Sequence, residues 1–290
     1  MLTMTTTKTS FSQALASGRS VLTAECVPPH SGDPEAVKKV SALLPSSLDA
    51  VVVADNPDEI HGSALACAAL MTREGRETVL TMVTRDRNRI ALESDALGAA
   101  ALGIGGILCL SGNHQSLGVC AEAASVNDID STQLEQIVKG LGLSGIAIGA
   151  VAHPQQRPVE LNLLRLKKKM AAGADFVLTQ PVFDVAAFTR WMDALRAAGL
   201  DKRAAIIASV LPLASAEQAE SLRQRKIYGT LAEDVVTRMK GASDPAKEGL
   251  AIAVAVAAQL KTVPGVRGVH ILCGGCEELA DQIIQAAGLV

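Results

Sequence analysis

The sequence predicts a single-domain α/β fold, the (β/α)8 or TIM barrel. Apolar runs of strand length recur along the chain, and segments with helical periodicity separate them. The 290 residues also suit one such barrel, which commonly takes about 250 residues. The runs are continuously apolar, as expected for parallel strands buried on both faces. We therefore expect residues 13–290 to form the barrel and the polar, threonine-rich residues 1–12 to form a flexible N-terminal segment.

The expected elements follow one another along the whole chain. The strands are Val21–Glu25, Ala50–Ala54, Val79–Thr84, Ile107–Leu110, Ile146–Val151, Phe176–Thr179, Ala205–Val210 and Val269–Leu272. Helical periodicity predicts helices over Pro34–Leu44, Asn88–Leu102, Val159–Ala172, Val185–Ala198 and Glu277–Ala287. The segment from Tyr228 to Lys261 is long for one βα unit, and we expect it to hold two helices.

Composition argues against several classes of function. The net charge of -3 provides no basic field that would attract nucleic acid. The longest apolar stretch, Leu250–Ala258, is too short for a membrane span, which takes about 20 residues. The N-terminal residues lack the apolar core of a signal peptide, so we expect a cytoplasmic protein. In that compartment the six cysteines are expected to be thiols and not a disulfide framework.

The first expected strand ends in an acid, Glu25, and Pro28 and Pro29 stop the strand shortly afterwards. In (β/α)8 barrels the active site is assembled from residues at the carboxyl ends of the strands. Polar or small residues also follow other expected strands: Asp55, Asn56, Thr84, Arg85, Asp86, Ser111, Gly112, Asn113, His114, His153, Thr179 and Gln180. The sequence therefore predicts an active site at this mouth. It contains neither the G-x-G-x-x-G pattern nor a P-loop.

Five blocks of sequence, in this order, resemble the methylenetetrahydrofolate reductase family. They are Glu25 with Pro28-Pro29, Leu110-Ser111-Gly112-Asn113, Lys169 with Ala171-Ala172-Gly173-Ala174-Asp175, Thr179-Gln180-Pro181-Val182-Phe183-Asp184, and Val210-Leu211-Pro212-Leu213. The family consists of flavoprotein barrels that interconvert 5,10-methylenetetrahydrofolate and 5-methyltetrahydrofolate. The block from Arg85 to Leu92 is similar to the branch of acetogenic and other anaerobic bacteria, in which a partner subunit accompanies the reductase.

The resemblance implies that Glu25 is the general acid that helps to open the five-membered ring of the folate. A carboxyl group can do this near neutral pH only if burial or a neighbouring negative charge raises its pKa. A capping or salt-bridged glutamate is the alternative. Gln180 would bind the pterin, with Asn113 beside it, and its alternative role is to cap the next helix.

The resemblance also implies a flavin, FAD or alternatively FMN, and no metal. The residues that match the family's cofactor contacts are Thr81, Ser111, Gly112, Asn113, His153, Asn162 and Lys169. Lys169 would meet the phosphates, and Gly112 would let the backbone approach the ring. His153 fits a structural histidine equally well.

Three positions depart from the family pattern. Asn113 replaces an aspartate, and the loss of negative charge there should raise the potential of the flavin. Ala216 aligns with an aromatic residue that stacks on nicotinamide or folate, and Cys276 aligns with an arginine. Direct use of NADH is therefore poorly supported, and we expect an electron-donor protein subunit and an oligomer. The pair Cys273 and Cys276 fits inert thiols, a redox pair, or half of a metal site that Cys26 or a partner completes.

Two other functions stay open at this point. The first is a folate-binding barrel without flavin chemistry that serves methyl transfer. The second is a docking subunit for an electron-transfer or corrinoid protein. One barrel fold hosts many chemistries, so the fold cannot choose among these functions. The visible spectrum of the purified protein would separate them from the reductase.

Overall fold

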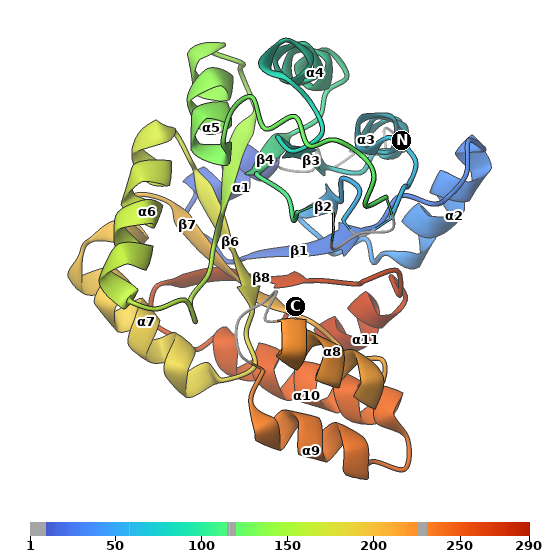
Figure 1. Ribbon diagram of the computed structural model, residues 1–290, viewed down its shortest axis with the longest axis vertical. Helices are drawn as coiled ribbons and strands as arrows, with labels where there is room; N and C mark the ends of the chain where they lie inside the picture. The colour runs from blue at the N-terminus through green and yellow to red at the C-terminus, as the bar shows by residue number, and fades with distance from the viewer. Residues whose placement is uncertain (1–9, 58, 115, 117–119, 226–230) are drawn as a thin grey trace, which may run out of the picture.

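Eight parallel strands close into a barrel in the computed structural model, which describes residues 10–57, 59–114, 116, 120–225 and 231–290 (Figure 1). Each strand pairs with the next one in sequence, and the last pairs with the first. The single-domain (β/α)8 prediction is confirmed. The strands are β1 (Val21–Cys26), β2 (Ala50–Val53), β3 (Thr78–Val83), β4 (Gly106–Leu110), β5 (Ala147–Ala152), β6 (Phe176–Pro181), β7 (Ala205–Val210) and β8 (Val266–Ile271).

Helices surround the barrel and alternate with its strands (Figure 1). They are α2 (Pro34–Leu43), α3 (Ala64–Arg73), α4 (Arg89–Ala101), α5 (Ser131–Gly140), α6 (Val159–Ala172), α7 (Val185–Ala197) and α11 (Leu279–Ala286). Side-chain oxygens at the start of several helices accept a backbone N–H and so satisfy a group that the helix leaves unpaired. These caps are Asp33, Ser63, Asn88, Asp130 and Asp184.

The connection between β7 and β8 holds a group of three helices, which lies beside the barrel (Figure 1). They are α8 (Ala216–Arg225), α9 (Glu233–Gly241) and α10 (Pro245–Leu260), and they contact one another in this order. The last two are the helices expected between Tyr228 and Lys261, and α8 adds a third. Among the described residues, no helix is long and apolar enough to cross a membrane.

A short helix, α1 (Phe11–Ala16), closes the amino end of the barrel. The Phe11 ring is fully buried and meets the Phe176 ring edge to face, with the centroids 5.2 Å apart. The Phe11 N–H donates to Glu77 Oε1 at 2.9 Å. A Cβ atom at Gly149 would lie 2.3 Å from the Phe176 ring, so the glycine leaves the space that this ring fills. Residues 1–9 lie outside the described part, but the fold begins before the expected boundary at residue 13, because Phe11 belongs to the barrel.

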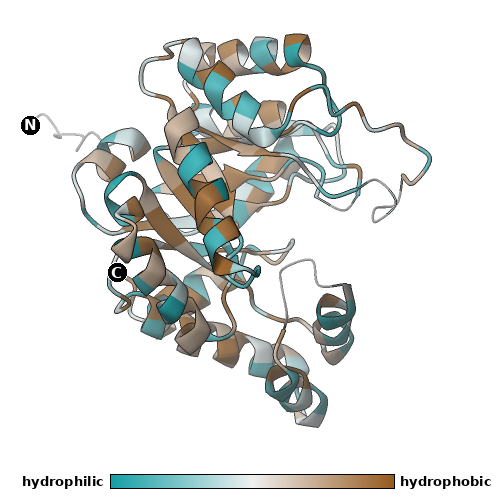
Figure 2. Cartoon of the chain, turned by 60° about the vertical axis from the view of Figure 1, so that its left-hand side comes forward, coloured by the Kyte–Doolittle hydropathy of each residue, from teal (hydrophilic) through white to brown (hydrophobic). Residues whose placement is uncertain are grey.

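The interior of the barrel changes from apolar to polar toward the carboxyl end. Inward-facing Val21, Val79, Ala205 and Phe176 form an apolar cluster at the amino end. Nearer the carboxyl end, four polar side chains on inward positions are at most 4% exposed: Thr23, Thr81, Ser209 and His270. The outward-facing strand residues pack against the apolar faces of the helices. The strands are mostly hydrophobic, whereas the helices mix hydrophobic and hydrophilic residues (Figure 2).

Candidate active site

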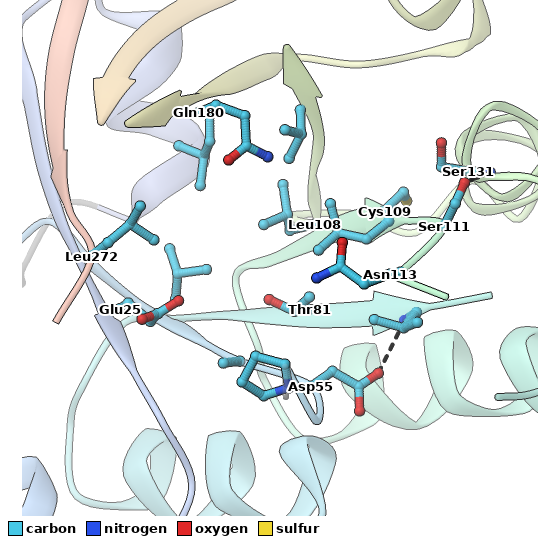
Figure 3. A pocket seen from close by; sticks show the side chains of 18 of the residues that line it. Glu25, Asp55, Thr81, Leu108, Cys109, Ser111, Asn113, Ser131, Gln180 and Leu272 are labelled. Atoms are coloured by element: carbon cyan, nitrogen blue, oxygen red, sulfur yellow. Dashed lines mark hydrogen bonds between the residues drawn. The ribbon is translucent and has the colours of Figure 1, made fainter. Parts of the chain in front are cut away.

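A cavity of about 320 Å³ opens at the carboxyl end of the barrel (Figure 3). The structure brings most of the expected site residues to its wall. These are Glu25, Thr81, Ser111, Gly112, Asn113, His153, Lys169 and Gln180. Asn162 is the expected residue that does not line this cavity. The strand-end rule therefore located the cavity correctly, because parallel strands bring their carboxyl ends to one mouth.

Glu25 and Gln180 reach the cavity from β1 and β6. Both side chains are half-buried, and Figure 3 shows the carboxyl group and the amide directed into the cavity. Glu25 Oε1 accepts the Gly274 N–H at 3.2 Å, so the loop after β8 holds this carboxyl group. No described residue hydrogen-bonds to the Gln180 amide, which leaves its donor and its acceptor available to a ligand.

A second carboxyl group, that of Glu277, lies between β8 and α11. It is 3% exposed and accepts the Val27 N–H at 3.0 Å. Burial raises the pKa of Glu277. Burial, and then the charges of Glu25 and Glu277, raise the pKa of the Cys273 thiol, so both carboxyl groups lie near this cysteine. The half-buried Glu25 and the buried Glu277 thus both lie near Cys273, on the side of the cavity formed by the loop after β8.

The loop after β4 is fixed by Arg85. This residue is 8% exposed, and its Nη1 donates to the Asn113 carbonyl oxygen at 3.0 Å. Two further hydrogen bonds, at 2.8 and 2.7 Å, join the guanidinium group to the Asp86 carboxylate. Gly112 packs directly on β3, since a Cβ atom there would lie 2.5 Å from Val83 Cγ1. The Asn113 side chain consequently points into the cavity from a well-anchored backbone (Figure 3).

Lys169 on α6 supplies a cation at the cavity wall. Its Nζ donates to the Val151 carbonyl oxygen at 2.8 Å, and burial lowers the pKa of Lys169. Glu135 on α5 lies close behind it and is fully buried, and neither carboxylate oxygen has a hydrogen-bond partner among the described residues. Burial raises the pKa of Glu135 to about 8, although the charge of Lys169 opposes this shift.

Asn162 lies behind the cavity and holds the loop after β5. Its Nδ2 donates to the His153 carbonyl oxygen at 2.6 Å, and its Oδ1 accepts the Trp191 Nε1–H at 3.0 Å. Both ends of the amide are therefore occupied by protein groups. His153 itself is exposed at the rim of the cavity.

Asp55 was expected at this mouth without a specific role, whereas Ser209 and His270 were not expected there. Asp55 Oδ2 accepts the Val83 N–H at 3.0 Å and a hydrogen bond from Arg87, and burial raises the pKa of Asp55 more than Arg87 lowers it. Ser209 and His270 lie at the floor and are 0% and 2% exposed. Their signal in the sequence was a single polar residue within an expected apolar run, Ser209 in Ala205–Val210 and His270 in Val269–Leu272.

All six cysteines are described, and all are free thiols. Cys273 is buried and Cys276 is half-buried, and the Cys276 N–H donates to the Cys273 carbonyl oxygen at 3.0 Å. Within the described ranges, no group of three or more His, Cys, Asp or Glu side chains is placed to hold a metal ion. Ala216 begins α8 and packs against the apolar core, outside the set of cavity-lining residues.

Together, the fold and the cavity define a (β/α)8-barrel protein with an acid, an amide and a cation around one strand-end ligand site. The chain belongs to the methylenetetrahydrofolate reductase family, whose model matches residues 10–288, and this is a family of oxidoreductases. The family resemblance and the expected enzyme class are thereby confirmed at the level of the family. The likeness to the branch of anaerobic bacteria stays a prediction.

Curated relatives agree with this assignment. The 5,10-methylenetetrahydrofolate reductase of Pectobacterium carotovorum subsp. carotovorum is 26% identical over 208 residues, which cover 69% of this chain and 67% of the relative. The enzyme of the same name from Escherichia coli (strain K12) is 25% identical over 216 residues, covering 72% and 70% of the two chains.

Solved structures share the fold. An uncharacterized protein from Clostridium thermocellum, described as binding two copies of 5-methyl-5,6,7,8-tetrahydrofolic acid, matches with a TM-score of 0.68 and 11% identity, over 97% of this chain and 100% of its own. A 2,3-dimethylmalate lyase matches with a TM-score of 0.54 and 13% identity, over 97% and 85% of the two chains. At these identities the likeness shows the fold alone.

Proposed function

We propose that this protein is a flavin-dependent methylenetetrahydrofolate reductase that interconverts 5,10-methylenetetrahydrofolate and 5-methyltetrahydrofolate. One observation carries the proposal: Glu25 and Gln180 line the same cavity as Asn113 and Lys169, in a chain of the reductase family. A proton donor, a pterin-binding amide and a cation for a phosphate group are the groups that such a reaction needs around its substrate and cofactor.

The cavity fits a flavin, which we propose is FAD, with FMN as the alternative. Gly112 lets the backbone approach a planar ring, and the polar Thr81 and Asn113 side chains line the same wall. Lys169 offers a positive charge to a phosphate group. A bound flavin would supply the hydride. Asn162 acts indirectly in this proposal, because it holds the His153 loop from behind.

Glu25 is proposed to hold the proton that the folate nitrogen takes up when the five-membered ring opens. The loop after β8 orients its carboxyl group through the Gly274 N–H. Gln180 would hold the pterin edge, since its amide can both donate and accept. Thermodynamics and not these residues sets the direction of the reaction in the cell.

We further propose that electrons arrive from a protein partner. Hydride transfer from nicotinamide needs an aligned pose within about 3.5 Å of the flavin. Ala216 offers only a methyl group where the family has a stacking aromatic, and it packs against the core. Cys276 likewise offers no charge. An oligomer and a cytoplasmic location remain predictions.

The visible spectrum of the purified protein, followed by chromatography of any released flavin, tests the proposal and separates FAD from FMN. We expect a flavin spectrum that bleaches on reduction and returns when 5,10-methylenetetrahydrofolate is added. A colourless protein that gains no flavin absorbance with FAD or FMN would contradict the proposal. If that protein still bound 5-methyltetrahydrofolate, the result would indicate the folate-binding barrel that serves methyl transfer.

A further inference from the structure

Ser209 and His270 form a polar floor beneath the cavity that the proposed function does not use. They lie side by side on β7 and β8, where Ser209 is the register partner of His270. Ser209 faces the interior because it is two residues beyond Ile207, a member of the interior cluster. Both residues line the cavity.

The Ser209 hydroxyl group is unpaired within the described part of the structure. The residue is 0% exposed, and its Oγ accepts and donates no hydrogen bond among the described residues. Buried polar side chains nearly always have a partner, and those that do not require an explanation. The other residues of β7, Ala205 to Ala208 and Val210, are apolar. An alanine at position 209 would therefore pack in this strand as well as a serine does. Because Ser209 also lines the cavity, its hydroxyl group indicates a partner that the described part of the chain does not supply.

The second ring nitrogen of His270, Nε2, has no hydrogen-bond partner among the described residues. The first, Nδ1, shares a hydrogen bond of 2.9 Å with Thr23 Oγ1. Burial lowers the pKa of His270 to about 3, so the imidazole is neutral under physiological conditions. A neutral imidazole presents at Nε2 either one donor or one acceptor, depending on the tautomer.

The character of the cavity wall indicates what this floor can bind. Apolar side chains, those of Val52, Val83, Leu108, Leu110 and Val151, line the cavity together with the polar groups described above. This mixture suits a ring that makes apolar contacts with its faces and hydrogen bonds with its edge. A hydroxyl group and a neutral imidazole suit carbonyl and N–H groups, but they cannot neutralise a phosphate or a carboxylate.

We propose that Ser209 and His270 form a subsite that hydrogen-bonds the pyrimidinone edge of the ring bound in the cavity. The inference rests on the proposed function, in which two molecules carry such an edge, the flavin and the folate. The chemistry recognised is the same in both, so the experiment measures each of them.

Ser209→Ala removes the hydroxyl group without breaking any bond to a described residue. His270→Asn places an amide near the position of Nδ1, which can keep the bond to Thr23, and removes Nε2. Thr84→Val is the matched control, because Thr84 Oγ1 is equally buried and equally without a described partner, but Thr84 lies outside the cavity-lining set. Flavin dissociation is measured by equilibrium ultrafiltration of the purified proteins, 5-methyltetrahydrofolate binding by calorimetry, and stability by urea unfolding.

We expect Ser209→Ala and His270→Asn each to raise the dissociation constant of one of the two ligands about three- to tenfold, the effect of losing one hydrogen bond. Ser209→Ala should unfold at the same or a higher urea concentration, and Thr84→Val should bind both ligands as the wild type does. Loss of folate affinity assigns the subsite to the pterin, and loss of flavin affinity assigns it to the cofactor. Unchanged affinity for both ligands in both variants would refute the proposed subsite without contradicting the proposed function. A wild-type protein that binds neither ligand overturns both.

Discussion

Gly112→Ala is expected to damage both the stability and the binding site of this protein. Gly112 has φ +86°, in the left-handed region, and Gly75 has almost the same value, φ +84°. At Gly112 a Cβ atom would lie 2.5 Å from Val83 Cγ1 and 3.2 Å from Arg85 Cβ. At Gly75 no described atom lies within 4 Å of that position. Both substitutions therefore place an alanine in the left-handed region, which costs free energy, and only Gly112→Ala adds a steric clash.

The expected magnitudes follow from these contacts. A left-handed backbone costs a residue with a Cβ atom about 1–2 kcal/mol, which is the whole expected loss for Gly75→Ala. Forcing a methyl group into a packed site costs about 1–3 kcal/mol more. Gly112→Ala should therefore lower the free energy of unfolding by about 2–5 kcal/mol. For a protein of this size each kcal/mol corresponds to roughly 2–4 °C in Tm.

The same substitution should also move Asn113. The methyl group presses on Arg85, whose guanidinium group holds the Asn113 carbonyl oxygen at 3.0 Å. We therefore expect weaker ligand binding in Gly112→Ala and wild-type binding in Gly75→Ala. Urea unfolding and ligand titration of both variants are the assays. Equal losses of stability in the two variants would refute the steric argument, because the backbone cost alone would then account for Gly112.

Four further predictions concern the site. Glu25→Gln should leave flavin reduction intact and slow folate turnover about a hundredfold, the scale of a lost general acid; wild-type turnover in steady-state assays would make Glu25 structural. Asn113→Asp should lower the flavin midpoint potential in a potentiometric titration, because it places a negative charge beside the ring; an unchanged or higher value would place Asn113 away from the flavin. Burial raises the pKa of Glu135 from 4.5 to about 8, so its contribution to stability is present below 4.5 and is lost as pH rises through about 8. Glu135→Gln lacks this pH dependence, so the free energy of unfolding of the variant minus that of the wild type should rise between about pH 5 and about pH 9 in urea titrations. A difference that stays constant with pH would contradict the raised pKa. Finally, with Ala216 and Cys276 in place, NADH or NADPH alone should reduce the flavin slowly in stopped-flow experiments; rapid reduction at micromolar nucleotide would refute the need for a partner.

The strands and the location of the cavity were predictable from the sequence for one physical reason. Parallel strands buried on both faces are continuous apolar runs, and a polar residue that ends such a run must lie at the carboxyl mouth. Glu25 and Gln180 were therefore found from local sequence alone. The family resemblance added the roles proposed for them.

The remaining features depend on contacts between distant parts of the chain. Asn162 belongs to a correctly predicted helix, but Trp191, 29 residues away, fixes which way its amide points. Ser209 stands in an apolar run, and only the pairing of β7 with β8 shows that it lies beside His270. Phe11 was assigned to a flexible segment because six residues of helix give little signal until their partner is known.

The closure of the barrel by α1 has a consequence for biosynthesis. The contacts of Phe11 are with Glu77 on the way into β3 and with Phe176 at the start of β6. A helix of six residues has little stability of its own in water. More than half of the 290 residues separate Phe11 from Phe176, so Phe11 leaves the ribosome well before Phe176 exists to cover it. Helix α1 therefore cannot complete its packing until β6 has been synthesised, and a nascent chain that stalls before residue 176 presents an uncovered phenylalanine to the chaperones and proteases around it.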